Sequence, residues 1–136
     1  MQGKITAGLG KAGFFLSREG YRRQFLEGLG FVPFPGTLNV LLDEPFPASS
    51  PPILIRGFSE EEECFGGCRC YHITINGMNA AAIRPERCRH PPELIEVIAP
   101  ANLRRTLNLK DGDSVEVIIG LSPARGSSDY AQMRRW

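Results

Sequence analysis

The dipeptide Asn76-Gly77 is the strongest constraint on how this chain can fold. It separates two strand-like segments, residues 67–75 and 78–83. Asn and Gly readily adopt the two positive φ angles of a type I′ turn, and the twist of that turn matches the twist of two antiparallel strands. The sequence therefore predicts a β-hairpin here and favours β-sheet as the main structure.

Five further segments have the composition of short strands: residues 4–7, 37–42, 53–58, 94–99 and 114–119. Fifteen Gly and eleven Pro in 136 residues mark frequent turns, one of them at Asp111-Gly112-Asp113, and favour short strands over a helical bundle. Six or seven short strands expose sheet edges unless the sheet closes on itself. We therefore predict a mainly β (α+β) fold built on a small closed barrel.

One main helix is expected from Ser17 onward, with Gly30 as its C-terminal cap. Its apolar residues recur at helical spacing on one face: Tyr21, Phe25, Leu26 and Leu29. Residues 100–107 can form one or two further helical turns. We assign residues 1–121 to a single barrel domain, and residues 122–136, rich in Pro, Gly, Ser and Arg without periodicity, to a mobile C-terminal tail.

The charge balance limits the classes of partner. Sixteen Lys and Arg against fifteen Asp and Glu give a net charge of +1, which argues against a surface that neutralises many phosphates, so no nucleic-acid partner is expected. No apolar run approaches the roughly 20 residues of a membrane span, and the N-terminus lacks the apolar core of a signal peptide. We expect a cytoplasmic monomer that does not bind membranes.

The glycine-rich segment Gly8-x-Gly10-x-x-Gly13 matches the string of a dinucleotide fingerprint but lacks the alternating βαβ units which that fingerprint needs. Glycines still allow a ligand to approach the backbone, and consecutive N–H groups can form an anion-binding nest, to which Lys11 adds a positive charge. A phosphate-binding loop and an ordinary turn both remain open.

Two polar positions on predicted strands are candidate ligand contacts. Thr37 and Asn39 are two residues apart, so their side-chain oxygens lie on one face and suit a Mg²⁺ ion that arrives with nucleotide phosphates. Alternatively, they only satisfy turn and strand ends. Glu96 shares a face with Leu94 and Ile98. If that face is internal, the carboxylate needs a partner, and if it is external, Glu96 is solvated.

Soft zinc-type ligands are concentrated in one region of the sequence: Cys64, Cys68, Cys70 and His72, with Cys88 and His90 downstream. Positions 68, 70 and 72 would project from one strand face, which is poor geometry for a tetrahedral ion, and the usual C-x2-C pairs are missing. We favour reduced, partly buried cysteines. The acidic run Glu60–Glu63 is expected to be a solvated loop.

Taken together, several blocks in fixed order resemble the archaeal CTP-dependent riboflavin kinase family across residues 8–119: GLGKAGFFLS and YRRQF, LGFVPFPGTLNVLL, GGCRCY, AAIRPERCRH, and LIEVIAPANLRRTLNLKDGDSVEV. The resemblance implies a six-stranded barrel of the cradle-loop type. It also implies transfer of the γ-phosphoryl group of CTP to the 5′-hydroxyl of riboflavin, giving FMN and CDP. The alternatives are a non-catalytic flavin or nucleotide sensor and, less favoured by the charge, a barrel-type DNA-binding regulator.

The resemblance also implies roles for particular residues, although it identifies no general base. Mg²⁺ would be held by Thr37 and Asn39, and the flavin would contact Cys88 and Glu96. The position of Cys88 is typically threonine in the family, and a thiol is the weaker hydrogen-bond donor. The nucleotide would be bound by two segments: Gly8, Leu9, Gly10, Lys11, Ala12 and Gly13, and Ala101, Asn102, Leu103 and Arg104.

Overall fold

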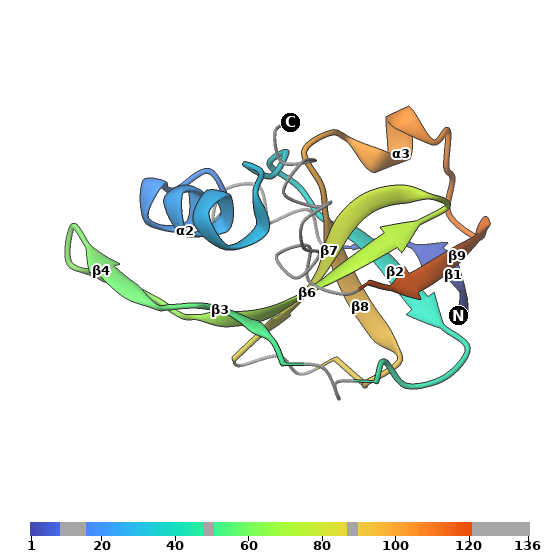
Figure 1. Ribbon diagram of the computed structural model, residues 1–136, viewed down its shortest axis with the longest axis horizontal. Coiled ribbons are helices and arrows are strands. Elements are labelled where there is room, and N and C mark those ends of the chain that lie inside the picture. Colours follow the sequence, from blue (N-terminus) through green and yellow to red (C-terminus); the bar gives the residue numbers. More distant parts are fainter. Residues whose placement is uncertain (9–15, 48–50, 87–89, 121–136) are drawn as a thin grey trace, which may run out of the picture.

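A computed structural model describes residues 1–8, 16–47, 51–86 and 90–120 of the chain (Figure 1). Two helices lie within these residues, α2 (Glu19–Leu29) and α3 (Leu103–Thr106). The strands are β1 (Gln2–Thr6), β2 (Leu38–Leu42), β3 (Ile53–Ile55), β4 (Phe58–Glu60), β5 (Glu63–Phe65), β6 (Cys68–Ile75), β7 (Met78–Pro85), β8 (Leu94–Ile98) and β9 (Ser114–Ile119). No helix in these ranges is long and apolar enough to cross a membrane.

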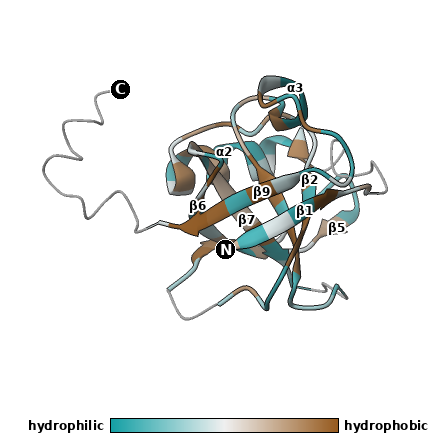
Figure 2. Cartoon of the chain, turned by 90° about the vertical axis from the view of Figure 1, so that its right-hand side faces the viewer, coloured by the Kyte–Doolittle hydropathy of each residue, from teal (hydrophilic) through white to brown (hydrophobic). Residues whose placement is uncertain are grey.

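Six of the strands form a closed antiparallel barrel. Their order is β6-β7-β8-β2-β1-β9, and β9 returns to pair with β6, for example through Val117 and Ile75. In Figure 2, β9 and β1 run side by side across the near wall. Closure leaves these strands without a free edge over the paired residues. The predicted mainly β fold with a six-stranded barrel is confirmed.

The predicted hairpin forms the longest ladder of the barrel. Asn76 and Gly77 have φ angles of 47° and 86°, as a type I′ turn requires. From this turn, β6 and β7 pair without interruption from Ile75 and Met78 to Cys68 and Pro85. A local two-residue signal therefore sets the register of two eight-residue strands.

Inward-facing residues from every barrel strand fill the interior. Val40, Ile75 and Val117 are fully buried there, and the interior core also takes Leu103 of α3. Because successive residues of a strand point to opposite faces, fixing these residues inside fixes their neighbours outside. The outward-facing residues of β2, β7 and β8 are therefore determined by the packing of the interior.

Helix α2 covers part of the outside of the barrel and creates a second core. Phe25 and Leu29 pack there with residues of β6, β7 and β8, including the fully buried Cys70 and Ile98. The helix ends at Gly30, whose φ of 86° and N–H bond to the Leu26 carbonyl form the predicted cap. The prediction that Leu26 shares the buried face is wrong. Its side chain is 50% exposed, because one residue of helix turns it about 100° away from Phe25.

Strands β4 and β5 form a short hairpin that projects from the barrel beside α2, here called the arm (Figure 1). The arm corrects two predictions. The expected strand 53–58 is divided at Gly57, where a Cβ would collide with the Phe65 carbonyl oxygen. In the acidic run, Glu61 to Glu63 are exposed as expected but Glu60 is half-buried, and the run is not a loop throughout, since Glu60 and Glu63 lie in strands and only the two residues between them form the turn.

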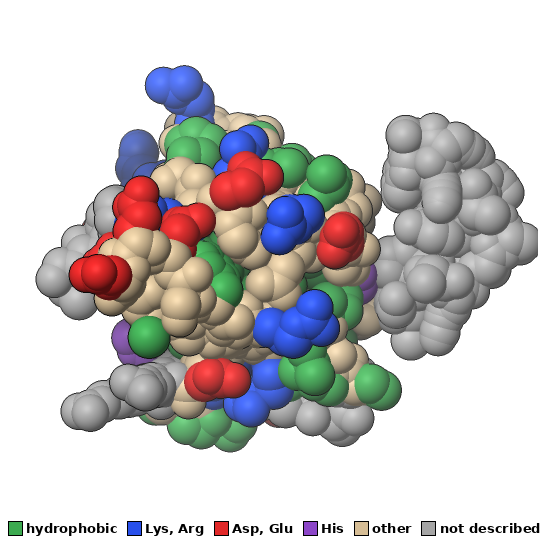
Figure 3. All heavy atoms as spheres, turned by 90° about the vertical axis from the view of Figure 1, so that its left-hand side faces the viewer, with side chains coloured by type: hydrophobic (Ala, Val, Ile, Leu, Met, Phe, Trp, Pro, Cys, Tyr) green, Lys and Arg blue, Asp and Glu red, His purple; other side chains and the backbone are tan. Residues whose placement is uncertain are grey.

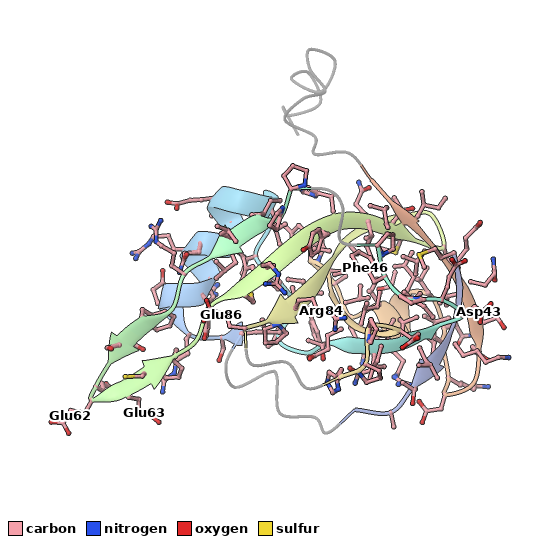
Figure 4. All side chains as sticks on the ribbon, turned by 90° about the horizontal axis from the view of Figure 1, so that it is seen from below. Asp43, Phe46, Glu62, Glu63, Arg84 and Glu86 are labelled. Atoms are coloured by element: carbon pink, nitrogen blue, oxygen red, sulfur yellow. The ribbon has the colours of Figure 1, made fainter. Side chains whose placement is uncertain are left out.

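Aromatic and ionic contacts attach the arm to α2. The Phe58 and Phe65 rings stack with centroids 5.0 Å apart, and Tyr21 of α2 meets Phe58 edge-on at 4.7 Å. Arg18 lies over the Phe65 ring and pairs with Glu63 at 3.1 Å. Figure 3 shows acidic and basic side chains interspersed over the face that carries α2 and the arm. Figure 4 shows Glu62 and Glu63 at the tip of the arm, far from Asp43 at the other end of the molecule.

A pair of neighbouring substitutions tests the second core. Phe25 is 1% exposed, so Phe25→Ala should lower the free energy of unfolding by about 3–5 kcal/mol, the range for emptying a buried aromatic site. Leu26→Ala, on the exposed face of the same helix, should change it by only about 0.5 kcal/mol. Urea denaturation measures both, and equal losses would contradict the assignment of these two faces.

Candidate functional site

The described end of the glycine-rich segment lies against a predicted metal ligand. Thr6 pairs with Asn39 across β1 and β2, and two residues later a Cβ on Gly8 would overlap the Asn39 side-chain amide. Only a glycine fits this approach without moving Asn39. The rest of the predicted nucleotide loop, Leu9, Gly10, Lys11, Ala12 and Gly13, lies outside the described residues.

Thr37 directly precedes β2, and Asn39 is the second residue of this strand. Leu38 and Val40 point into the barrel, so Asn39 points outward, and both Thr37 and Asn39 are half-buried. Neither side chain is hydrogen-bonded to another described residue. Two neutral oxygens without a competing partner fit Mg²⁺, which accepts few protein ligands when phosphates and waters complete its shell. The chemistry of this donor pair is therefore compatible with a metal that arrives with a nucleotide.

An open pocket of about 200 Å³ lies between two segments distant in sequence. Residues 34–38 form one wall and residues 97–104 form the other. The lining residues are Phe34, Gly36, Thr37, Leu38, Val97, Ala99, Ala101, Asn102, Leu103 and Arg104. The fold thus brings Thr37 together with all four residues of the second predicted nucleotide segment.

The α3 turn fixes the second wall of this pocket. Asn102 caps the turn by accepting a hydrogen bond from the Arg105 N–H at 3.2 Å, and the buried Leu103 anchors it in the interior core. Arg104 extends toward solvent, where its guanidinium pairs with Asp111 at 2.9 Å. Part of the positive charge of Arg104 is therefore already offset within the protein.

Glu96 lies next to Asn39 on the outer surface of the barrel. It sits in the middle of β8, opposite Asn39 of β2 on one side and Ile83 of β7 on the other. Its side chain is 19% exposed, and Nε2 of His90 lies 3.6 Å from its carboxylate. Glu96 thus lies outside the barrel but is largely shielded from solvent. A carboxylate in such a position can still contact a ligand. Cys88, the other predicted flavin contact, lies outside the described residues.

The cysteines of β6 form a buried thiol pair. The sulfur atoms of Cys68 and Cys70 are 3.9 Å apart, within the second core, whereas Cys64 lies exposed on the arm. The hydrogen bond with Cys68, together with burial, raises the pKa of the Cys70 thiol. The same hydrogen bond lowers the pKa of Cys68, against the effect of burial. Within the described ranges, no cluster of three His, Cys, Asp or Glu side chains could hold a metal ion.

Two other titratable groups respond mainly to their burial. Desolvation lowers the pKa of His72, which faces outward from β6. Desolvation also raises the pKa of Tyr21, with smaller contributions from Cys68 and Glu86. The Tyr21 hydroxyl donates to the Gly66 carbonyl at 2.6 Å, which ties α2 to the arm. Neither group lines the pocket.

Sequence reasoning missed several pocket residues, above all Phe34. Its neighbours Gly36, Val97 and Ala99 also line the pocket, but their sequence context marks them only as turn and strand residues. The sequence could have indicated Phe34 as a candidate contact, because this residue stands between Pro33 and Pro35 directly before the predicted ligand segment. An aromatic residue held between two prolines is constrained in backbone conformation and available for contact.

Comparisons with known proteins show the family to which the chain is related. Residues 5–119 match the family model for CTP-dependent riboflavin kinase, described as domain of unknown function DUF120. The chain is 53% identical over 120 residues to a riboflavin kinase of Methanocella arvoryzae, covering 88% of this chain and 56% of that protein. It is 45% identical over 128 residues to a riboflavin kinase of Ignicoccus hospitalis, covering 88% and 70%. A riboflavin kinase of Pyrobaculum aerophilum is 47% identical over 123 residues, covering 86% and 59%. The chain therefore spans little more than half the length of most of these relatives.

Proposed function

Because the chain belongs to the CTP-dependent riboflavin kinase family, we propose that it transfers the γ-phosphoryl group of CTP to the 5′-hydroxyl of riboflavin, giving FMN and CDP. One observation carries the proposal: Thr37 lines the pocket and directly precedes β2, in which Asn39 lies beside Glu96. Among the described residues, predicted contacts to the nucleotide, the metal and the flavin are therefore neighbours. Phosphoryl transfer depends mainly on holding donor and acceptor in line and neutralising charge, which such an arrangement can provide.

On the donor side, the nucleotide would occupy the pocket between residues 34–38 and 97–104. Its phosphates would extend toward Gly8 and Asn39, where the backbone comes closest to the β2 side chains. Mg²⁺ held by Thr37, Asn39 and the phosphates would neutralise charge on the transferring group. Thr37 and Asn39 would themselves determine where the phosphate chain ends, since Asn39 lies in β2 and Thr37 directly precedes it.

On the acceptor side, Glu96 would accept a hydrogen bond from riboflavin. Its position one strand away from Asn39 would bring the flavin close to the phosphates. His90, 3.6 Å from the carboxylate, restricts where the Glu96 side chain can lie. Cys88 would contact the flavin with a weaker donor than the threonine typical of the family.

A simple assay tests the proposal. The protein is incubated with riboflavin, Mg²⁺ and either CTP or ATP, and FMN is separated and quantified by its fluorescence. FMN formation with CTP supports the kinase. Binding of both ligands without FMN would instead identify a non-catalytic sensor, the main alternative. The interspersed charges in Figure 3 give no support on that face to a DNA-binding regulator, which would need a basic surface.

The metal role of β2 is tested by Thr37→Ala and Asn39→Ala. Each change removes one oxygen ligand, so the Mg²⁺ concentration needed for half-maximal activity should rise at least about tenfold, the scale seen when even outer partners of a metal are lost. Thr74→Ala and Asn79→Ala are matched controls, since these residues face each other across the β6–β7 hairpin. Wild-type activity of both test variants at limiting Mg²⁺ would rule the site out.

The acceptor role of Glu96 is tested by Glu96→Gln. Loss of a charged hydrogen-bond acceptor should raise the KM for riboflavin about tenfold or more while leaving the KM for CTP nearly unchanged. Glu116→Gln, on the exposed face of β9, serves as the control for removing one carboxylate. If the riboflavin KM of Glu96→Gln stays at the wild-type value, Glu96 does not bind the flavin.

A further inference from the structure

We propose that the ring of Phe34 stacks against the nucleotide base in the pocket. The inference rests on the proposed function for the identity of that nucleotide. It assigns a role to a residue that the resemblance did not mark, and it places the base against the Phe34 side of the pocket.

Phe34 is an aromatic side chain that the fold leaves accessible. It is 39% exposed, although phenylalanine is among the residues most often buried. Phe34 is also one of the residues that line the pocket, whose opposite wall carries Ala101 and Asn102. An accessible aromatic surface facing a concave site is a common feature of sites that bind planar rings.

The backbone holds Phe34 in place before any ligand arrives. The Phe34 N–H donates to the Ala99 carbonyl at 2.8 Å, which ties one wall of the pocket to the other. The Gly36 N–H donates back to the Phe34 carbonyl at 2.8 Å, closing a γ-turn around Pro35. A Cβ on Gly36 would lie 3.5 Å from the Phe34 ring, so the ring rests over this glycine. Little conformational freedom would be lost when the ring is covered by a base.

The pocket lining combines polar and apolar residues. Thr37 stands two residues before Asn39, whose side chain contacts Gly8, and this polar group suits phosphates and a metal. The lining also contains Leu38, Val97 and Ala99, which are residues of the interior core. An apolar wall beside an exposed aromatic ring suits the base rather than the charged part of a nucleotide. The base therefore fits between Phe34 and residues 101–104.

Stacking has a particular consequence for specificity. Every base offers a π-face, so stacking adds affinity with little discrimination between bases. Phe34 should therefore strengthen the binding of CTP and ATP alike. A preference for one base would have to come from hydrogen bonds to the edge of the base. The backbone of residues 101–104, in the opposite wall of the pocket, could make such bonds.

Titration calorimetry on the full chain tests the stacking. Phe34→Ala should raise the Kd for CTP and for ATP about tenfold, within the range measured for base–aromatic stacking. Phe34→Leu should lose most of the same affinity, and Phe34→Trp should keep it. Inorganic tripolyphosphate, which has no base, should bind all variants equally with Mg²⁺ present. Leu54→Ala removes another exposed apolar side chain, on β3, and should change nothing.

Several results would overturn the stacking role. One is a Kd of Phe34→Ala for CTP equal to that of the wild type. Others are an equal loss of tripolyphosphate binding in Phe34→Ala, or an effect of this substitution on the KM for riboflavin alone. Absence of nucleotide binding by the wild type would also overturn it. If Phe34→Ala does not fold, as judged by circular dichroism, the comparison of Phe34→Leu with Phe34→Trp decides. Failure of the proposed function looks different: the wild type would make no FMN, yet nucleotide binding would still depend on an aromatic residue at position 34.

Discussion

The pairing of β8 with β2 is the constraint on which the candidate site depends. In this register Asn39 faces Glu96, while Val40 faces Ile95 in the interior core. The apolar residues cannot turn outward without exposing the barrel core to water, and a shift by one residue would reverse every side chain. Hydrophobic packing inside the barrel therefore holds two polar side chains side by side on its outer surface.

The second core explains how an outer surface can shelter a carboxylate. Helix α2 covers Cys70, Ala81 and Ile98 on the outside of β6, β7 and β8, so these strands are buried on both faces along part of their length. Glu96 stands two residues before Ile98, at the margin of this covered region, and is sheltered without being enclosed. A carboxylate there lies within reach of solvent while facing a partly apolar surface.

The elements predicted from sequence are those with local causes. Asn76-Gly77 and Gly30 impose backbone angles that few other residues adopt, and the structure has both features. The arm was missed because its turn places Glu61 and Glu62 at positive φ, against their preference, and tertiary contacts from Arg18 compensate. The pocket could not be predicted from local sequence patterns either. Its two walls are about sixty residues apart in the chain, and only barrel closure brings them together.

The near balance of acidic and basic residues limits how the pocket could bind phosphates. The net charge of the chain is only +1, and Arg104, the basic residue that lines the pocket, is already paired to Asp111. A triphosphate there would depend on a divalent metal and on backbone N–H groups, whose partial charges need no basic side chains. Such a site attracts phosphates only where its geometry fits, and not over the whole surface. The near balance of acidic and basic residues gives the chain almost no net excess of positive charge with which to attract polyanions in general.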